Sequence, residues 1–193
     1  MKTSILIFIL VLSGGCSRKV SETAVIDTAH HDTNSTAMKN TLTISTTAFQ
    51  KDSAIPQKFT CQGEDHSPAL AWSGAPENTK SYALVVEDPD APHGTFYHWV
   101  MYDIPPTERG LAENIEKRDR LGNGTRQGTN SFGQMGFNGP CPPPGKPHRY
   151  YFKLFALDAM LNIPGEATRD TLMSAMNGHI LAEGEIMGTY ARK

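Results

Sequence analysis

The sequence predicts an all-β fold with minor α content, an antiparallel, Greek-key-like β-sandwich of two sheets with a few short helices. Two features predict it. Short segments rich in β-branched and aromatic residues recur along the chain, and turns that contain proline or glycine separate them. Because such short strands divided by turns are typical of sandwiches, this fold fits better than alternating βαβ units.

Four segments carry the strand signal. In the first, Leu42 and Ile44 alternate with polar neighbours, as on a strand with one buried face. The second is a buried-looking apolar run, and the last two are rich in aromatic and branched residues. The predicted strands are residues 42–46, 82–87, 97–104 and 149–157.

One helix is predicted near the end of the chain. Thr168 is a suitable N-cap, and Gly178 is a suitable stop. Between them, Leu172, Met173 and Met176 recur on one helical face, where the methionines are most simply core residues.

A final strand and a long loop complete the domain. Residues 180–190 predict a strand that Gly184 and Gly188 interrupt. Residues 121–145 are rich in glycine and proline, and such a loop inside a compact domain is functional or is held by its neighbours.

Composition limits the classes of function. A chain of 193 residues with 38% hydrophobic and 20% charged residues fits one soluble domain with short extensions. The formal net charge is −2, and no dense run of lysine and arginine occurs. The charge therefore gives little reason to expect binding to nucleic acid.

Residues 1–15 predict a lipoprotein-type signal peptide. Lys2 precedes an apolar run too short to span a membrane, and small residues lead to Cys16. This arrangement resembles a bacterial lipoprotein signal with lipid attached to Cys16, although ordinary secretion stays open. We therefore expect an exported protein of the cell envelope, lipid-anchored to a bacterial membrane, at the outer membrane or the periplasmic face in a diderm cell.

Residues 16–40 predict the lipidated cysteine and a flexible linker, and residues 41–193 a single domain. The linker is polar and lacks an apolar period. Its His30-His31 pair is more often incidental than a metal site, and no metal or cofactor is predicted. In an oxidising compartment, Cys61 and Cys141 are candidates for a disulfide, with two free thiols as the alternative.

A polar block suggests a binding pocket. Asp88 and Asp90 are separated by a proline and followed by Pro92, so they belong to a stiff turn that leaves a strand. His98 lies on the next strand, and His148 begins a later one. Each residue alone is more often structural than functional.

Six landmarks in order give these residues a family resemblance. They are Phe59-Thr60-Cys61-Gln62-Gly63, the segment 67–74, the segment 88–92 with His98-Trp99, the segment 139–143, His148-Arg149-Tyr150, and the segment 178–182. The chain resembles the phosphatidylethanolamine-binding protein (PEBP) family, in its bacterial Raf kinase inhibitor-like branch, over residues 42–192.

The resemblance implies a small pocket for an anion, either a phosphate or a phospholipid head group. The residues that the resemblance assigns to this pocket are Asp88, Pro92, His98, Gly139, Pro140, His148 and Tyr150. We add Asp90, which belongs to the same block as Asp88. Imidazoles, a phenol and the backbone N–H groups at Gly139 can donate to a phosphate, and Asp88 can orient a histidine. We expect Phe137 to narrow the mouth and Arg149 to pair with Asp88 or Asp90.

Other functions remain open at this stage. An exported protein of this family could inhibit a serine protease through an exposed loop, with residues 122–136 as the candidate. A hydrolase could use the histidine and aspartate cluster, but Ser67 and Ser131 lie in no nucleophile-elbow sequence, so we expect no enzyme. A structural envelope lipoprotein with a vestigial pocket is the third alternative.

Overall fold

The computed structural model describes residues 42–164 and 166–192, which belong to one compact unit, residues 38–193. The predicted signal peptide at residues 1–15, the lipidated Cys16 and the linker at residues 16–40 lie outside the described residues. These remain predictions. None of the described helices is long and apolar enough to cross a membrane.

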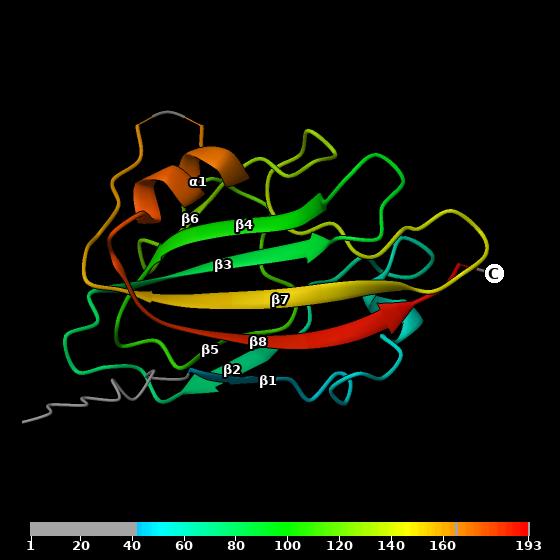
Figure 1. The fold of residues 1–193 in the computed structure, drawn as a ribbon, viewed down its shortest axis with the longest axis horizontal. Helices are drawn as coiled ribbons and strands as arrows, with labels where there is room; N and C mark the ends of the chain where they lie inside the picture. The colour runs from blue at the N-terminus through cyan, green and yellow to red at the C-terminus, as the bar shows by residue number, and fades with distance from the viewer. Residues whose placement is uncertain (1–41, 165, 193) are drawn as a thin grey trace, which may run out of the picture. The chain divides into compact units, whose positions relative to one another are not determined.

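Two antiparallel sheets form the domain (Figure 1). In order across the large sheet, the strands are β6 (Arg126–Gln127), β4 (Phe96–Ile104), β3 (Ser81–Asp88), β7 (His148–Leu157) and β8 (Ile180–Tyr190). The small sheet contains β1 (Thr43–Ser45), β2 (Leu70–Ser73) and β5 (Gly110–Leu111). Every pair of neighbouring strands is antiparallel, and the predicted all-β class is confirmed.

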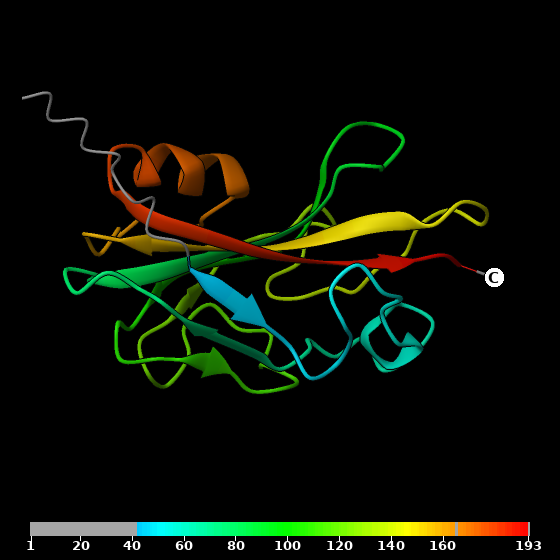
Figure 2. The same ribbon diagram turned by 60° about the horizontal axis from the view of Figure 1, so that its bottom comes forward.

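The main core lies between the two sheets. Trp99 and Leu154 of the large sheet are fully buried, and Ile44 and Trp72 of the small sheet pack into the same cluster. Alternate residues of β2 are buried, as expected for a strand with one face on the core. Figure 2 shows the small sheet on one face of the large sheet and the helix on the other.

The helix α1 (Arg169–Met176) covers the outer face of the large sheet. As predicted, Thr168 is its N-cap and accepts a hydrogen bond from the Thr171 N–H, and the helix ends just before Gly178. Leu172 and Met176 are fully buried in a second apolar cluster that includes residues of β3, β4 and β7. A 3-10 helix, η1 (Gln57–Phe59), lies between β1 and β2.

The glycines of β8 do not interrupt it, contrary to the sequence-based prediction. β8 is continuous over 11 residues. A Cβ at Gly184 would lie 2.1 Å from the Leu42 carbonyl oxygen, and a Cβ at Gly188 would lie 2.6 Å from Ile55 Cγ1. Glycine at these positions lets the segment around β1 approach the strand closely.

Candidate functional site

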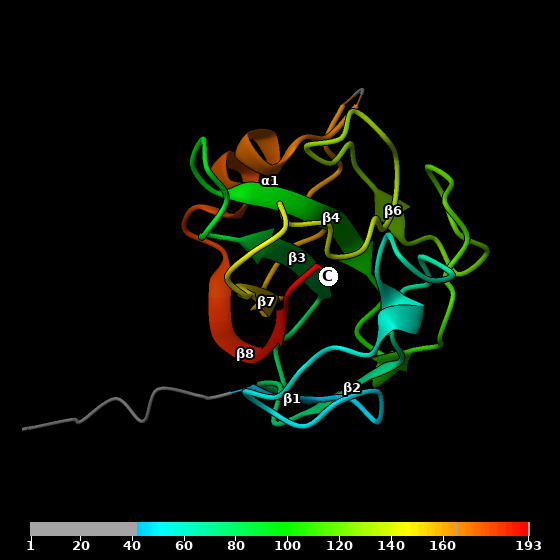
Figure 3. The same ribbon diagram turned by 90° about the vertical axis from the view of Figure 1, so that its right-hand side faces the viewer.

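A pocket of about 280 Å³ lies at the end of the large sheet where β3 finishes and β7 begins. Figure 3 faces this end of the domain. The lining residues are Asp88, Ala91, Pro92, His93, Gly94, Thr95, Phe96, His98, Phe132, Cys141, Pro142, Pro143 and His148. Of the eight residues predicted to bind the ligand, four line this pocket: Asp88, Pro92, His98 and His148.

Asp88 holds His148 in a fixed orientation. Asp88 is 3% exposed, and its Oδ2 accepts a hydrogen bond from His148 Nδ1 at 2.7 Å. Its Oδ1 accepts one from the Asp90 N–H at 2.9 Å, which closes the turn after β3. Because a carboxylate only accepts, Nδ1 of His148 carries a proton, and Nε2 is left for a ligand.

His98 is held in the same way by a different acceptor. It is 2% exposed, and its Nδ1 donates to the Asn138 carbonyl oxygen at 2.7 Å. Burial lowers the pKa of the His98 imidazole, because the charged ring would lose its hydration. Among the described residues, Nε2 of neither His98 nor His148 has a hydrogen-bond partner.

Tyr150 lies behind His98 and does not itself line the pocket. The two ring centroids are 5.3 Å apart, and the rings meet edge to face. Tyr150 is fully buried, and its hydroxyl has no hydrogen-bond partner among residues 42–164 and 166–192. Burial, and then the nearby Asp88 carboxylate, raise the pKa of the phenol, so it stays a potential donor.

Asp90 was predicted to bind the ligand but is paired with Arg149. Arg149 donates from Nη2 to Asp90 Oδ1 at 2.6 Å and from Nε to Oδ2 at 2.9 Å. The hydrogen bonds from Arg149 lower the pKa of Asp90 to about 2. As expected for Arg149, the pair is structural: it fastens the turn after β3 to β7.

Gly139 and Pro140 support the pocket wall without lining it. The Gly139 N–H, predicted to donate to a phosphate, donates to Asp65 Oδ1 at 2.6 Å instead. A Cβ at Gly139 would lie 2.2 Å from the Phe59 carbonyl oxygen, so only glycine fits. The Pro140 carbonyl accepts a hydrogen bond from the Cys61 N–H at 3.1 Å.

A disulfide joins Cys61 to Cys141, whose Cα atoms are 5.4 Å apart. Of the two alternatives that the sequence left open, the structure therefore contains the disulfide. Cys141 lines the pocket, and Cys61 lies shortly after η1. The disulfide thus ties one wall of the pocket to a segment 80 residues away in sequence.

The aromatic residue at the pocket mouth is Phe132, and the prediction for Phe137 is wrong. Phe137 is 1% exposed and packs against Trp99, with ring centroids 5.4 Å apart. Phe132 is 41% exposed and meets Phe96 edge to face, with centroids 4.7 Å apart. The sequence signal that could have identified Phe132 is its position between the turn-forming residues Asn130 and Gly133. In the structure, Asn130 Oδ1 accepts a hydrogen bond from the Phe132 N–H in this turn.

The loop at residues 122–136, the candidate for gripping a protease, is fastened to the domain. Gln127 donates from Nε2 to two backbone carbonyl groups, and its Oε1 accepts from Trp99 Nε1 at 2.7 Å. Asn130 is 4% exposed and donates to the Gly136 carbonyl at 2.9 Å. Within this loop, only residues 122–123 and 131–134 are exposed.

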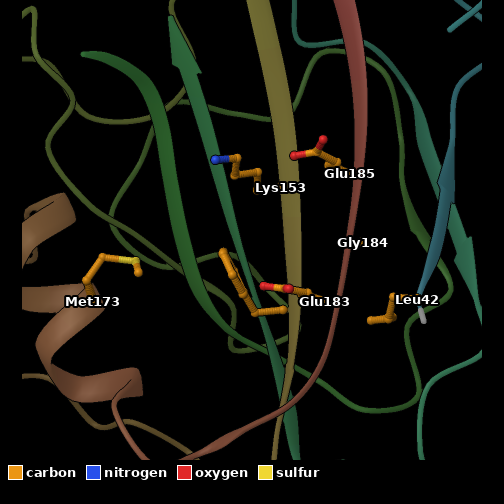
Figure 4. A pocket seen from close by; sticks show the side chains of 7 residues that line it. Leu42, Lys153, Met173, Glu183, Gly184 and Glu185 are labelled. Atoms are coloured by element: carbon orange, nitrogen blue, oxygen red, sulfur yellow. The ribbon is translucent and has the colours of Figure 1, made fainter. Parts of the chain in front are cut away.

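A larger hollow of about 600 Å³ lies on the outer face of the large sheet (Figure 4). Lys153, Glu185 and Met173 of β7, β8 and α1 border it. The Lys153 ammonium already pairs with Glu87 at 2.5 Å. Among the described residues, no cluster of histidine, cysteine and carboxylate side chains could hold a metal ion. The smaller pocket is the better candidate site, because it contains four of the predicted ligand-binding residues and the larger hollow contains none of them.

A family profile described as phosphatidylethanolamine-binding protein matches residues 45–191. The chain belongs to this family. The match covers all the residues that line the smaller pocket. The position of the PEBP profile thus agrees with the resemblance found in the sequence.

Curated relatives named UPF0098 protein are similar over much the same region. The one from Methanothermobacter thermautotrophicus is 44% identical over 151 residues, which are 78% of this chain and 99% of the relative. The one from Aquifex aeolicus is 48% identical over 147 residues, which are 75% of this chain and 85% of the relative.

Two solved PEBP structures share the fold. The PEBP homologue CT736 of Chlamydia trachomatis has a TM-score of 0.73 and 39% identity, covering 80% of this chain and 99% of its own. E. coli YbcL, described as a new member of the mammalian PEBP family, has a TM-score of 0.74 and 34% identity, covering 79% and 99%.

Proposed function

We propose that this PEBP-family protein binds a small phosphorylated anion, such as a phospholipid head group, in the pocket at the end of the large sheet. One observation carries the proposal: the protein holds Nδ1 of both His98 and His148, and both Nε2 atoms remain for a ligand. Fixed imidazole nitrogens that line a pocket are suitable partners for phosphate oxygens and hydroxyl groups.

The size of the pocket favours a head group over a complete lipid. Its volume of about 280 Å³ lies just below the range of roughly 300–1,000 Å³ that drug-sized ligands occupy. A phosphate with a short substituent suits such a volume, whereas two acyl chains need far more room. The description of the matched family as phosphatidylethanolamine-binding protein also supports a phospholipid-type ligand.

The hydrogen bonds of the two serines favour binding over hydrolysis. Ser67 Oγ accepts a hydrogen bond from the Ile115 N–H at 2.9 Å, and Ser131 Oγ accepts one from the Tyr97 N–H at 2.9 Å. Among the described residues, neither hydroxyl bonds to a histidine, which is the usual base that activates a serine nucleophile. We therefore propose a binding protein with a regulatory role and no catalytic step.

We propose that binding takes place at the bacterial cell envelope, with the domain anchored through lipid on Cys16. The support is the signal-like sequence of residues 1–16. Growth with labelled palmitate should label the wild-type protein and leave the Cys16→Ser variant unlabelled and released from membranes. Equal labelling of both would contradict the anchor.

Calorimetric titration of residues 38–193 with phosphoethanolamine and with phosphate tests the pocket. We expect saturable binding, weakened at least about tenfold in His98→Asn and in His148→Asn, because each loses a hydrogen bond to a charged ligand. The matched control is His179→Asn, because His179 bonds Asp158 at 2.7 Å outside the pocket. The affinity of this variant for phosphoethanolamine and phosphate should equal that of the wild type. Absence of binding in the wild type would contradict the proposal.

A further inference from the structure

The two pocket histidines have unequal partners. His148 Nδ1 faces the Asp88 carboxylate, whereas His98 Nδ1 faces the neutral Asn138 carbonyl, each at 2.7 Å. Both rings line the same pocket. The same pair of side chains can therefore play two different roles toward one ligand.

The charge of the pocket opposes an anion. The lining residues include the Asp88 carboxylate and no lysine or arginine. Arg149 is paired with Asp90, and Arg192 reaches the wall only at Cys141 Sγ, 3.8 Å away. A phosphate entering beside a carboxylate that is 3% exposed needs a compensating positive charge.

The surroundings of His148 allow its imidazole to supply this positive charge. The titratable or charged groups around it are Asp88 of β3, Asp90 and His93 of the following turn, His98 of β4, Tyr150 and Arg149 of β7, and Tyr190, its register partner on β8. An imidazolium at His148 would be compensated by Asp88 on one side and by the anion on the other. Its Nε2–H would then donate to the anion.

His98 is the weaker acceptor for a proton. It is 2% exposed and has only a backbone carbonyl beside Nδ1. Its burial, which lowers the pKa of the ring, leaves it neutral near pH 7. A neutral His98 with a proton on Nδ1 presents a lone pair at Nε2, so it accepts a hydrogen bond and cannot donate one.

Building on the proposed function, we propose that the pocket takes up one proton with its phosphorylated ligand, that His148 carries this proton, and that His98 accepts a hydrogen bond from the ligand. The ligand class is thereby narrowed. It must carry both an anionic oxygen that accepts from His148 and an O–H or N–H group that donates to His98. Phosphomonoester monoanions and zwitterionic aminoalkyl phosphates satisfy both conditions.

Calorimetry and NMR of residues 38–193 with phosphoethanolamine test this inference. At about pH 7.5, titrations in buffers of different ionisation enthalpy should report uptake of about one proton per bound ligand, and Kd should rise about tenfold per pH unit above that pH. The His148 ring-carbon resonances, assigned from the His148→Asn spectrum, should move to protonated positions on saturation. Those of His98 should not.

Each outcome decides between the two proposals. Failure of the wild-type domain to bind refutes the proposed function and this inference with it. Binding with no proton uptake and a Kd independent of pH overturns the inference and leaves the function standing. Proton uptake without protonation of His148 overturns its assignment as the carrier. The His179→Asn control should show the wild-type proton uptake.

Discussion

Two histidine–aspartate pairs with the same bond length lie in different surroundings. His148 and Asp88 are 2.7 Å apart with side chains 13% and 4% exposed, whereas His179 and Asp158 are 2.7 Å apart with side chains 45% and 42% exposed. Exposed ion pairs contribute about 0–1 kcal/mol, whereas leaving a buried polar group unpaired costs about 1–3 kcal/mol. Burial, and not bond geometry, therefore determines how much each pair contributes to the stability of the fold.

The largest effect should come from removing the disulfide beside the buried pair. The Cys61→Ala/Cys141→Ala variant should lose about 2–5 kcal/mol of unfolding free energy, since the bridge closes a loop with a sequence separation of 80. Urea denaturation of the oxidised proteins measures it. Ligand binding should weaken as well, because Cys141 lines the pocket. A loss under about 1 kcal/mol would show that the wall is held without the bridge.

Removing the acid from each pair compares them directly. Asp88→Ala should cost about 2–3 kcal/mol, because it leaves the His148 Nδ1–H and the Asp90 N–H without their acceptor. Asp158→Ala should cost less than about 1 kcal/mol. Urea denaturation of both variants at neutral pH gives the two values, and equal losses would contradict the claim that burial makes the His148–Asp88 pair the more stabilising one.

Lowering the pH should destabilise the folded protein through His98 in the pocket. Because burial lowers the pKa of His98 in the folded state, the unfolded chain binds more protons below about pH 6.5. Stability should therefore fall as the pH falls, by up to about 1.4 kcal/mol per pH unit from this residue. His98→Asn should flatten this part of the profile of unfolding free energy against pH, and an unchanged profile would contradict the assignment.

The smallest effect should come from the Asp90–Arg149 pair, which resembles the exposed pair in its surroundings. The Arg149 side chain is 50% exposed, so Arg149→Met should cost less than about 1 kcal/mol. The pKa of Asp90, about 2 in the wild type, should return toward the ordinary aspartate value of 3.8. NMR titration of the carboxyl carbon measures it. The stability that Asp90 contributes is present above about pH 3.8 and is lost as the pH falls toward 2.

The sequence predicted the long elements well because their signals are local. Residues 82–87, 97–104 and 149–157 fall within β3, β4 and β7, and Thr168 caps α1. The short strands β2, β5 and β6 were not predicted. Each has two to four residues and depends on pairing with a neighbour, which no local pattern reports.

The site was predicted in part, and mainly through the family resemblance. The local pattern placed Asp88, Pro92, His98 and His148 at strands and turns, and the resemblance assigned them to one pocket, where the structure brings them together. The partner of the Gly139 N–H is Asp65, 74 residues away. Phe137 was predicted at the pocket mouth, but it packs against Trp99 in the core, and Phe132 lies at the mouth instead. Contacts between residues so far apart follow from the tertiary fold.

The glycines of β8 have a consequence for solubility. β8 is an edge strand of the large sheet, and a long exposed edge is a template for aggregation between molecules. The close approach at Gly184 and Gly188 lets the segment at residues 42–55 occupy that edge. The Leu42, Asp52 and Ile55 N–H groups donate to carbonyl groups of β8. These two positions without side chains therefore protect the domain against association of its own sheets.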